Sequence, residues 1–239
     1  MSDANELRTD YAFEYVSGDR AGTTSTVTVV LDESSLDRKN LPRENLPDWT
    51  ALEYQQCSSC PLSTAENTRC PAAVALAELA DVFRGVSSFE EAVVSVRTNG
   101  RTIGMETTVQ KGLRSLMGLS MATCGCPGLA RFKPLARFHL PFATREDTLN
   151  RMVGSYFIAQ YLLAAKGAKH SFDLADLKAW YEQVHEINRS LAARMGDAWE
   201  GDAGSNALVL LDVLAQELPM SIDADLREME PWFAAYLDG

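Results

Sequence analysis

The sequence has no excess of positive charge, and this absence excludes one large class of functions. Lysine and arginine together number 22, against 33 aspartates and glutamates, so the net charge at pH 7 is −11. Proteins that bind nucleic acid neutralise phosphates with a basic face, and anionic membranes attract the same kind of surface. We therefore expect neither nucleic acid nor a membrane as a partner.

A secretory signal and a membrane-spanning run are also missing. Residues 1–6 are polar and lack the cationic and apolar regions of a signal peptide. The most apolar stretch, about 152–165, is interrupted by Ser155 and Gln160 and falls short of the roughly 20 apolar residues that a membrane helix needs. These absences predict a soluble, cytoplasmic protein.

Known catalytic signatures are absent as well. The chain contains no GxSxG elbow, no phosphate-binding P-loop and no dinucleotide-binding GxGxxG fingerprint, and it has three histidines. The sequence therefore identifies no reaction and no substrate, and whether the protein is an enzyme stays open.

The residue pattern predicts an α+β fold. Alternating aromatic and β-branched residues around Gly18 and Gly22 predict a β-hairpin over about 11–31, and Asn99-Gly100 predicts a second one over about 94–109. Pro71 is expected to begin a helix that ends near Gly85, and another helix is expected over 111–123. The two hairpins should form a small antiparallel sheet with helices packed on it.

The last hundred residues are expected to form a helical bundle. Thr144 with Asp147 predicts a capping box, and Asp173 is expected to cap the next helix. A third helix, roughly 205–218, should end at Pro219, and a fourth should start near Ser221 and be broken at Pro231. We expect one domain over 1–239, with an N-terminal lobe of about 1–140 and a helical lobe of about 141–239.

All five cysteines lie in one third of the chain. Cys57 and Cys60 form a CxxC, Cys70 follows, and Cys124 and Cys126 come after the second hairpin and a helix. A CxxC turn can direct two thiolates at one ion, and further thiolates can complete a tetrahedral site. The clustering predicts a metal centre, although reduced thiols that merely pack, or a redox pair, would also fit.

Zinc and an iron–sulfur cluster both suit four thiolates. Three of the five cysteines, Cys60, Cys70 and Cys126, precede proline, as in ferredoxin-type cluster loops. Zinc is nevertheless the favoured metal and an iron–sulfur cluster the alternative, because thiolate ligands alone do not choose between them.

Several motifs resemble an uncharacterised family of bacterial proteins. The resemblance covers nearly the whole chain and rests on CxxCPL, CP, GCP and ARFHLPFA motifs within residues 52–54, 57–62, 70–73, 110–121, 125–127 and 134–143. The family's usual Ser-Gly-Cys-Pro stands where this chain has Cys124-Gly125-Cys126-Pro127. The resemblance thus implies that Cys126 is the fourth ligand and Cys124 a spare or alternate one. It implies no activity.

Two residues of the ARFHLPFA motif are candidates for a supporting role. His139 could bind the metal, donate a hydrogen bond to a thiolate or act as a general base. As a base it could pair with Cys124 or Cys126 as a nucleophile. It could equally hold the backbone of its own loop in place through a hydrogen bond. Arg137 could neutralise a thiolate-rich site or form a structural ion pair.

The leading hypothesis is a metal-binding protein whose centre at Cys57, Cys60, Cys70 and Cys126 clips a loop to a helix end. The alternatives are an iron–sulfur or cysteine-dependent redox enzyme, and a metal-free structural or interaction protein. Substrate, partner and oligomeric state do not follow from the sequence.

Overall fold

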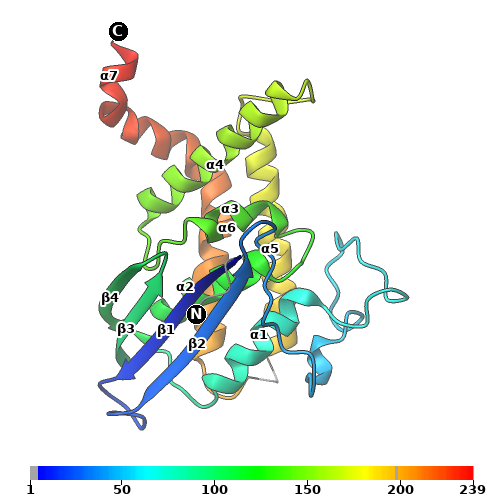
Figure 1. The fold of residues 1–239 in the computed structure, drawn as a ribbon, viewed down its shortest axis with the longest axis vertical. Coiled ribbons are helices and arrows are strands. Elements are labelled where there is room, and N and C mark those ends of the chain that lie inside the picture. The colour runs from blue at the N-terminus through cyan, green and yellow to red at the C-terminus, as the bar shows by residue number, and fades with distance from the viewer. Residues whose placement is uncertain (1–4, 197–198, 239) are drawn as a thin grey trace.

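The α+β fold is confirmed in the computed structural model, which describes residues 5–196 and 199–238 (Figure 1). Two hairpins form one antiparallel sheet in the order β2-β1-β3-β4. The strands are β1 Glu6–Tyr15, β2 Thr24–Asp32, β3 Glu91–Thr98 and β4 Arg101–Thr108.

Both hairpins lie where the alternation predicts them. β1 is central, so Tyr11 pairs with Val27 on one side and with Val96 on the other. Asn99 and Gly100 have φ angles of 49° and 73°, and two consecutive positive φ angles are those of the tight hairpin turn that Asn-Gly favours. The turn chemistry therefore fixes the register of the second hairpin.

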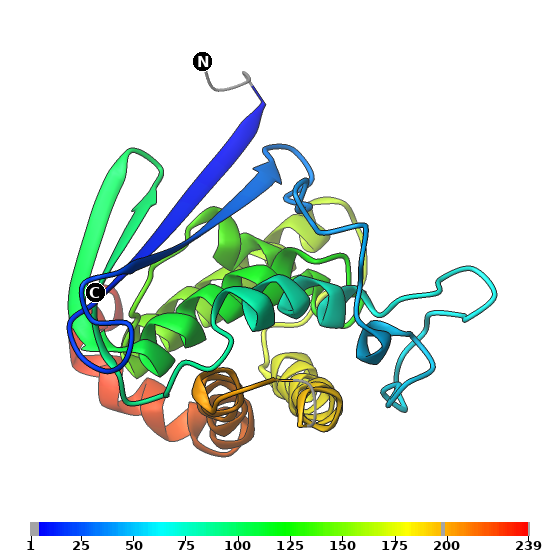
Figure 2. The same ribbon diagram turned by 90° about the horizontal axis from the view of Figure 1, so that it is seen from below.

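One face of the sheet is buried beneath helices. The helices are α1 Pro71–Val82, α2 Val109–Thr123, α3 Lys133–Arg137, α4 Arg145–Ala165, α5 Ala175–Met195, α6 Ala203–Met229 and α7 Ala234–Leu237, with 3-10 turns at Asp48–Thr50, Ala130–Phe132 and Glu230–Phe233. Figure 2 shows three layers: the sheet, then α1 and α2, then α5 and α6. Tyr11, Phe13 and Tyr15, which share a face because strand side chains alternate, are all buried.

The predicted capping box at the start of α4 is confirmed. The Asp147 N–H donates to the Thr144 hydroxyl at 3.1 Å and the Thr144 N–H donates to the Asp147 carboxylate at 3.0 Å. The prediction that Asp173 caps the next helix is wrong by one residue: the N-cap of α5 is Leu174, without a side-chain cap. Asp173 precedes it, and its carboxylate accepts the N–H of Ala175 at 2.9 Å.

The prediction that Pro219 ends a helix is wrong. α6 continues through Pro219 from Ala203 to Met229, so no new helix begins near Ser221. Ala215, Leu218 and Ile222 on either side of the proline are buried. Burial of this continuous apolar stripe outweighs the one missing backbone hydrogen bond. The expected break at Pro231 is present, because α6 gives way there to the 3-10 turn.

The buried apolar residues form two clusters. The larger joins the sheet, α1, α2, the C-terminal half of α5 and the start of α6. The smaller joins α4, the start of α5 and the C-terminal half of α6. Phe132 and Val184 pack against both clusters, so the long helices α5 and α6 connect the sheet to the helical end of the molecule.

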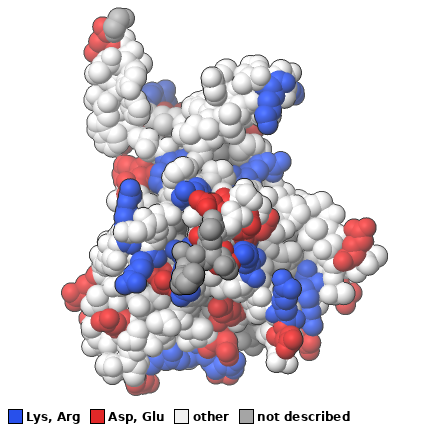
Figure 3. Space-filling view, in the orientation of Figure 1, with Lys and Arg blue, Asp and Glu red and all other residues white. Residues whose placement is uncertain are grey.

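The surface carries both signs of charge. On the face shown in Figure 3, acidic and basic side chains are interspersed. Within the part of the chain that the structure describes, no helix combines the length and the apolarity needed to cross a membrane.

Candidate metal centre

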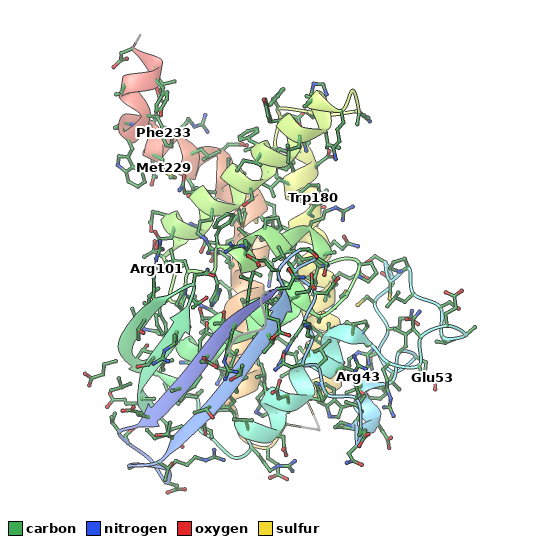
Figure 4. All side chains as sticks on the ribbon, in the orientation of Figure 1. Arg43, Glu53, Arg101, Trp180, Met229 and Phe233 are labelled. Atoms are coloured by element: carbon green, nitrogen blue, oxygen red, sulfur yellow. The ribbon has the colours of Figure 1, made fainter. Side chains whose placement is uncertain are left out.

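The CxxC lies on a long loop that is closed at its base. Ala51 and Arg69 form an antiparallel bridge, the Leu52 N–H donates to the Thr68 carbonyl at 3.0 Å and the Cys70 N–H to the Thr50 carbonyl at 2.8 Å. Between these contacts the chain has no helix or strand and is mostly exposed. The loop projects beyond α1, with Glu53 on it (Figure 4). Irregular loops of this length usually need a cross-link or a function to be retained.

Within this loop the CxxC forms a tight turn. The Cys60 N–H donates to the Cys57 carbonyl at 3.0 Å, so both thiols leave the same turn, as a shared metal ion would require. Both side chains are partly buried and pack against the main core, as does Leu62. The segment that carries the CxxC is therefore turned toward the protein, although the loop beyond it is exposed.

Helix α5 holds the loop through three residues spaced four apart, so that they share one helix face. Arg194, which is 2% exposed, donates to the carbonyls of Trp49 at 2.9 Å, Ala51 at 2.6 Å and Leu52 at 3.0 Å. One guanidinium thus donates to three carbonyls, of which the Ala51 carbonyl also accepts the N–H of Tyr54 at 3.2 Å.

Further along this face, Ser190 and Glu186 hold the loop closer to its cysteines. The Ser190 hydroxyl donates to the Gln55 carbonyl. The Glu186 carboxylate accepts the hydroxyl of Ser58 and, at 3.0 Å, the N–H of Ser59. Ser58 and Ser59 are the two residues between the cysteines of the CxxC, so α5 positions the turn itself.

The other cysteines approach from two helix ends. Cys70 is the residue before α1 and is buried, with Pro71 as the first helical residue. Cys124 follows the last residue of α2, and Gly125, whose φ angle is 90°, turns the chain to Cys126. Three separate segments therefore bring thiols to one region next to α5.

The segment after Cys126 presses directly on α5. A methyl group at Gly128 would stand 2.8 Å from Cδ1 of Ile187, closer than carbon atoms pack. The Leu129 N–H donates to the Cys126 carbonyl at 3.1 Å. Burial raises the pKa of the Cys126 thiol, and the backbone groups of Gly128 and Leu129 oppose part of that rise. Backbone groups that favour the thiolate are a usual feature around metal-bound cysteines, because they stabilise the negative charge.

The thiols lie close enough to influence one another. Burial raises the pKa of Cys57, a hydrogen bond with Ser190 opposes this rise, and the nearby thiols of Cys70 and Cys60 add to it. Burial likewise raises the pKa of Cys126 to about 11, and Cys70 and Cys57 are again among the groups that raise it. The pKa values of Cys57 and Cys126 are therefore raised in part by neighbouring thiols, which places these sulfurs near one another.

Cys124 differs from the other four. It is buried, its thiol donates to the Met121 carbonyl at an Sγ to O distance of 3.1 Å, and its sulfur accepts the N–H of Cys126 at 3.4 Å. Burial raises its pKa far above the ordinary value, with Cys126 adding to the rise. Cys124 is thus held as a protonated thiol within the backbone of its own turn.

All five cysteines are free. Over residues 5–196 and 199–238, no group of three or more histidine, cysteine, aspartate or glutamate side chains has an arrangement that could hold a metal ion as it stands.

His139 is hydrogen-bonded to a strand rather than to a thiol. Its Nε2 lies 2.6 Å from the hydroxyl of Tyr11 on β1. Burial lowers its pKa to about 4, and the charge of Arg151 contributes to the decrease. A cysteine nucleophile is usually a thiolate paired with an imidazolium. Here the imidazole is neutral and paired with a phenol, and the pKa of the Cys126 thiol is raised.

Arg137 has structural partners. Its guanidinium lies 3.4 Å from the side-chain oxygen of Asn99 and 3.9 Å from the carboxylate of Glu33, and it stands over the ring of Phe138. These contacts tie the ARFHLPFA motif to the turn of the second hairpin and to the segment after β2.

Sequence reasoning did not find Glu186, Ser190 and Arg194. Their spacing of four is present in the sequence, but on an amphipathic helix it is indistinguishable from a solvated face. The partners of Glu186 and Arg194 lie more than a hundred residues away in the chain, so only the fold reveals the connection.

The chain belongs to a known family. Residues 9–234 match the family described as Domain of unknown function (DUF6901), which agrees with the resemblance that the cysteine motifs indicated. Comparisons with curated proteins and with solved structures give no match. The family therefore gives the chain a class but no activity.

Proposed function

We propose that this protein binds one metal ion through the thiolates of Cys57, Cys60, Cys70 and Cys126, and that the centre is mainly structural. The observation that carries the proposal is the gathering of thiols from three separate segments, which is close enough for neighbouring thiols to raise the pKa of Cys57 and of Cys126. A cation reverses this mutual repulsion, because it favours every thiolate at once.

The proposed centre would connect the loop to α1 and to the end of α2. The loop has few buried apolar residues of its own, and its other attachments are hydrogen bonds to α5. Metal binding that occurs only in the folded state adds its binding free energy to stability. The hydrogen bonds that hold Cys124 support its assignment as the spare cysteine.

Zinc is the favoured metal. An iron–sulfur cluster with a redox role is the second candidate, supported by the three Cys-Pro pairs and by the backbone groups that favour the Cys126 thiolate.

A reducing compartment such as the cytoplasm suits free thiols. The net charge of −11 disfavours nucleic acid and a membrane as partners. The chain is proposed to form a single domain with lobes dividing near residue 140.

The test is metal analysis and thermal melting of protein purified without oxygen or chelator. We expect about one zinc per chain and no visible absorption. Cys57→Ser should lose the metal and lower the free energy of unfolding by about 3 kcal/mol, the scale that a ligand at a hundred times its Kd provides.

The matched control is Cys124→Ser, whose hydroxyl can replace the thiol in both hydrogen bonds; it should keep the metal and nearly the same melting temperature. Iron with sulfide and a broad visible band would establish the cluster instead. The absence of bound metal together with an unchanged melt in Cys57→Ser would refute both candidates.

A further inference from the structure

A cavity lies among α2, α4, α5, α6 and the segment around α3. None of the four proposed metal ligands lines it. Its volume is about 500 Å³, within the range of sites for drug-sized ligands. Most of the lining is apolar, including Leu119, Leu129, Phe132, Leu140, Leu211 and Leu214. An apolar cavity of this size has room for the hydrocarbon part of a small organic molecule.

Two arginines line the cavity without a carboxylate partner. In the part of the chain that the structure describes, Arg114 on α2 forms no ion pair and no hydrogen bond, and burial lowers its pKa. Arg151 on α4 donates from Nη2 to the carbonyls of Leu135 at 2.8 Å and Phe138 at 2.9 Å, while its Nε is buried and unpartnered. Two desolvated positive charges thus face a common space.

The acidic groups nearby are already engaged. Glu217, which also lines the cavity, pairs with Arg145 at 3.0 Å, and Arg145 pairs in addition with Asp225 at 2.9 Å. Asp147 favours the charge of Arg151, but its carboxylate accepts the N–H of Thr144 in the capping box. Neutralisation of Arg114 and Arg151 is therefore left to a group from outside the chain.

Asn188 provides an independent indication of a ligand. This residue of α5 lines the same cavity and is 1% exposed, yet neither its Nδ2 nor its Oδ1 has a hydrogen-bond partner among the described residues. Buried side-chain amides are nearly always hydrogen-bonded, because burial without a partner is costly. A donor and an acceptor thus both lack partners on a residue that lines the same cavity as the two arginines.

We propose that this cavity binds an amphipathic organic anion, with its carboxylate or phosphate held by Arg114 and Arg151, its polar atoms bonded to Asn188, and its hydrocarbon part against the leucines. Arginine suits both head groups, because its planar guanidinium donates two parallel hydrogen bonds to either. The site shares no residue with the four proposed metal ligands, so it can be tested whatever the metal content.

The experiment is titration calorimetry of the whole chain with three probes of equal chain length: decanoate, decyl phosphate and decanol. We expect saturable binding of at least one anion. Decanol should bind with a Kd at least about ten times higher, since the loss of a hydrogen bond to a charged group costs more free energy than one tenfold step in Kd. The tighter of the two anions identifies the head group.

Three variants locate the binding. Arg114→Gln should weaken anion binding by roughly tenfold. Asn188→Leu removes the unpartnered amide, so it should fold at least as well as the unmodified chain and yet bind the anion less tightly. The matched control Arg131→Gln removes an exposed charge that stands over the Trp180 ring and does not line the cavity, and should leave binding unchanged.

If Arg114→Gln fails to fold, the proposal is tested by the difference in Kd between the anions and decanol and by the Kd of the Asn188→Leu variant. The proposal is overturned if neither anion binds, if decanol binds as tightly as the anions, or if both cavity variants bind like the control.

Discussion

Some buried polar side chains in this protein have specific partners, while others, such as Asn188, have none among the described residues. Arg194 donates to three carbonyls of the loop before the CxxC, and His139 pairs with Tyr11 of β1. Such groups stabilise the fold only while every partner is in place, because a buried polar atom without a partner is costly. Their protonation states therefore affect stability.

His139 predicts a pH dependence of stability. Burial lowers its pKa to about 4 in the folded protein, against an ordinary value of about 6.5 in an unfolded chain. Between these values the unfolded state binds the proton and the folded state does not. The free energy of unfolding should therefore fall, by on the order of 1–3 kcal/mol, as the pH decreases from about 6.5 to about 4.

Urea unfolding at a series of pH values measures this effect. Carboxylates titrate in part of the same range, so the informative quantity is the difference between the unmodified protein and His139→Gln, which cannot titrate. His170→Gln, at an exposed position, is the control and should keep the full slope. An identical slope in His139→Gln would contradict the assignment.

At the scale of elements, the C-terminal helices are shaped by packing rather than by local propensity. α6 passes through Pro219 because its apolar stripe is buried on both sides of the proline. The helix therefore bears a local cost that the tertiary contacts outweigh.

Replacing Pro219 should reveal this cost. Pro219→Ala restores a backbone N–H within an existing helix, and alanine is the more favourable residue there by up to about 3 kcal/mol. We expect the variant to be more stable, by about 1–3 kcal/mol, with an unchanged helix content in circular dichroism. Chemical unfolding provides the measurement, and Met220→Ala, at an 88% exposed neighbour, is the control. A less stable Pro219→Ala would mean that a bend at the proline is needed for packing.

At the scale of the whole molecule, α5 joins parts of the chain that are remote in sequence. One face contacts the loop that carries the CxxC through Glu186, Ser190 and Arg194. Ile187 packs against Gly128, just beyond Cys126. The candidate metal centre and the main core thus both contact α5. Loss of the hydrogen bonds between α5 and the loop should affect the cysteine loop first.

Arg194→Met should destabilise the protein by about 3 kcal/mol, because the carbonyls of Trp49 and Leu52 lose their donor and that of Ala51 keeps only the N–H of Tyr54. The loop should also open, so Cys57 and Cys60 should react faster with a thiol reagent under native conditions. Arg189→Met, at an exposed position of the same helix, should change stability by less than about 0.5 kcal/mol. Equal effects of the two substitutions would show that the contacts of Arg194 do not hold the loop.

The sequence by itself determined the local features of this protein. Alternation at period two, Asn99-Gly100 and the Thr144 capping box depend on residues that are neighbours in the chain, so both hairpins and the start of α4 could be predicted. The clustering of the cysteines also indicated one candidate site, and the expectation that the chain belongs to an uncharacterised family is confirmed over residues 9–234.

Only the tertiary structure decided the rest. The course of α6 through Pro219, the pairing of His139 with Tyr11, the hold of α5 on the cysteine loop and the cavity with Asn188 all depend on contacts between distant segments. Such contacts follow from the total burial of apolar surface and the satisfaction of buried polar groups across the whole fold. A local pattern contains no information about which remote surface will cover it.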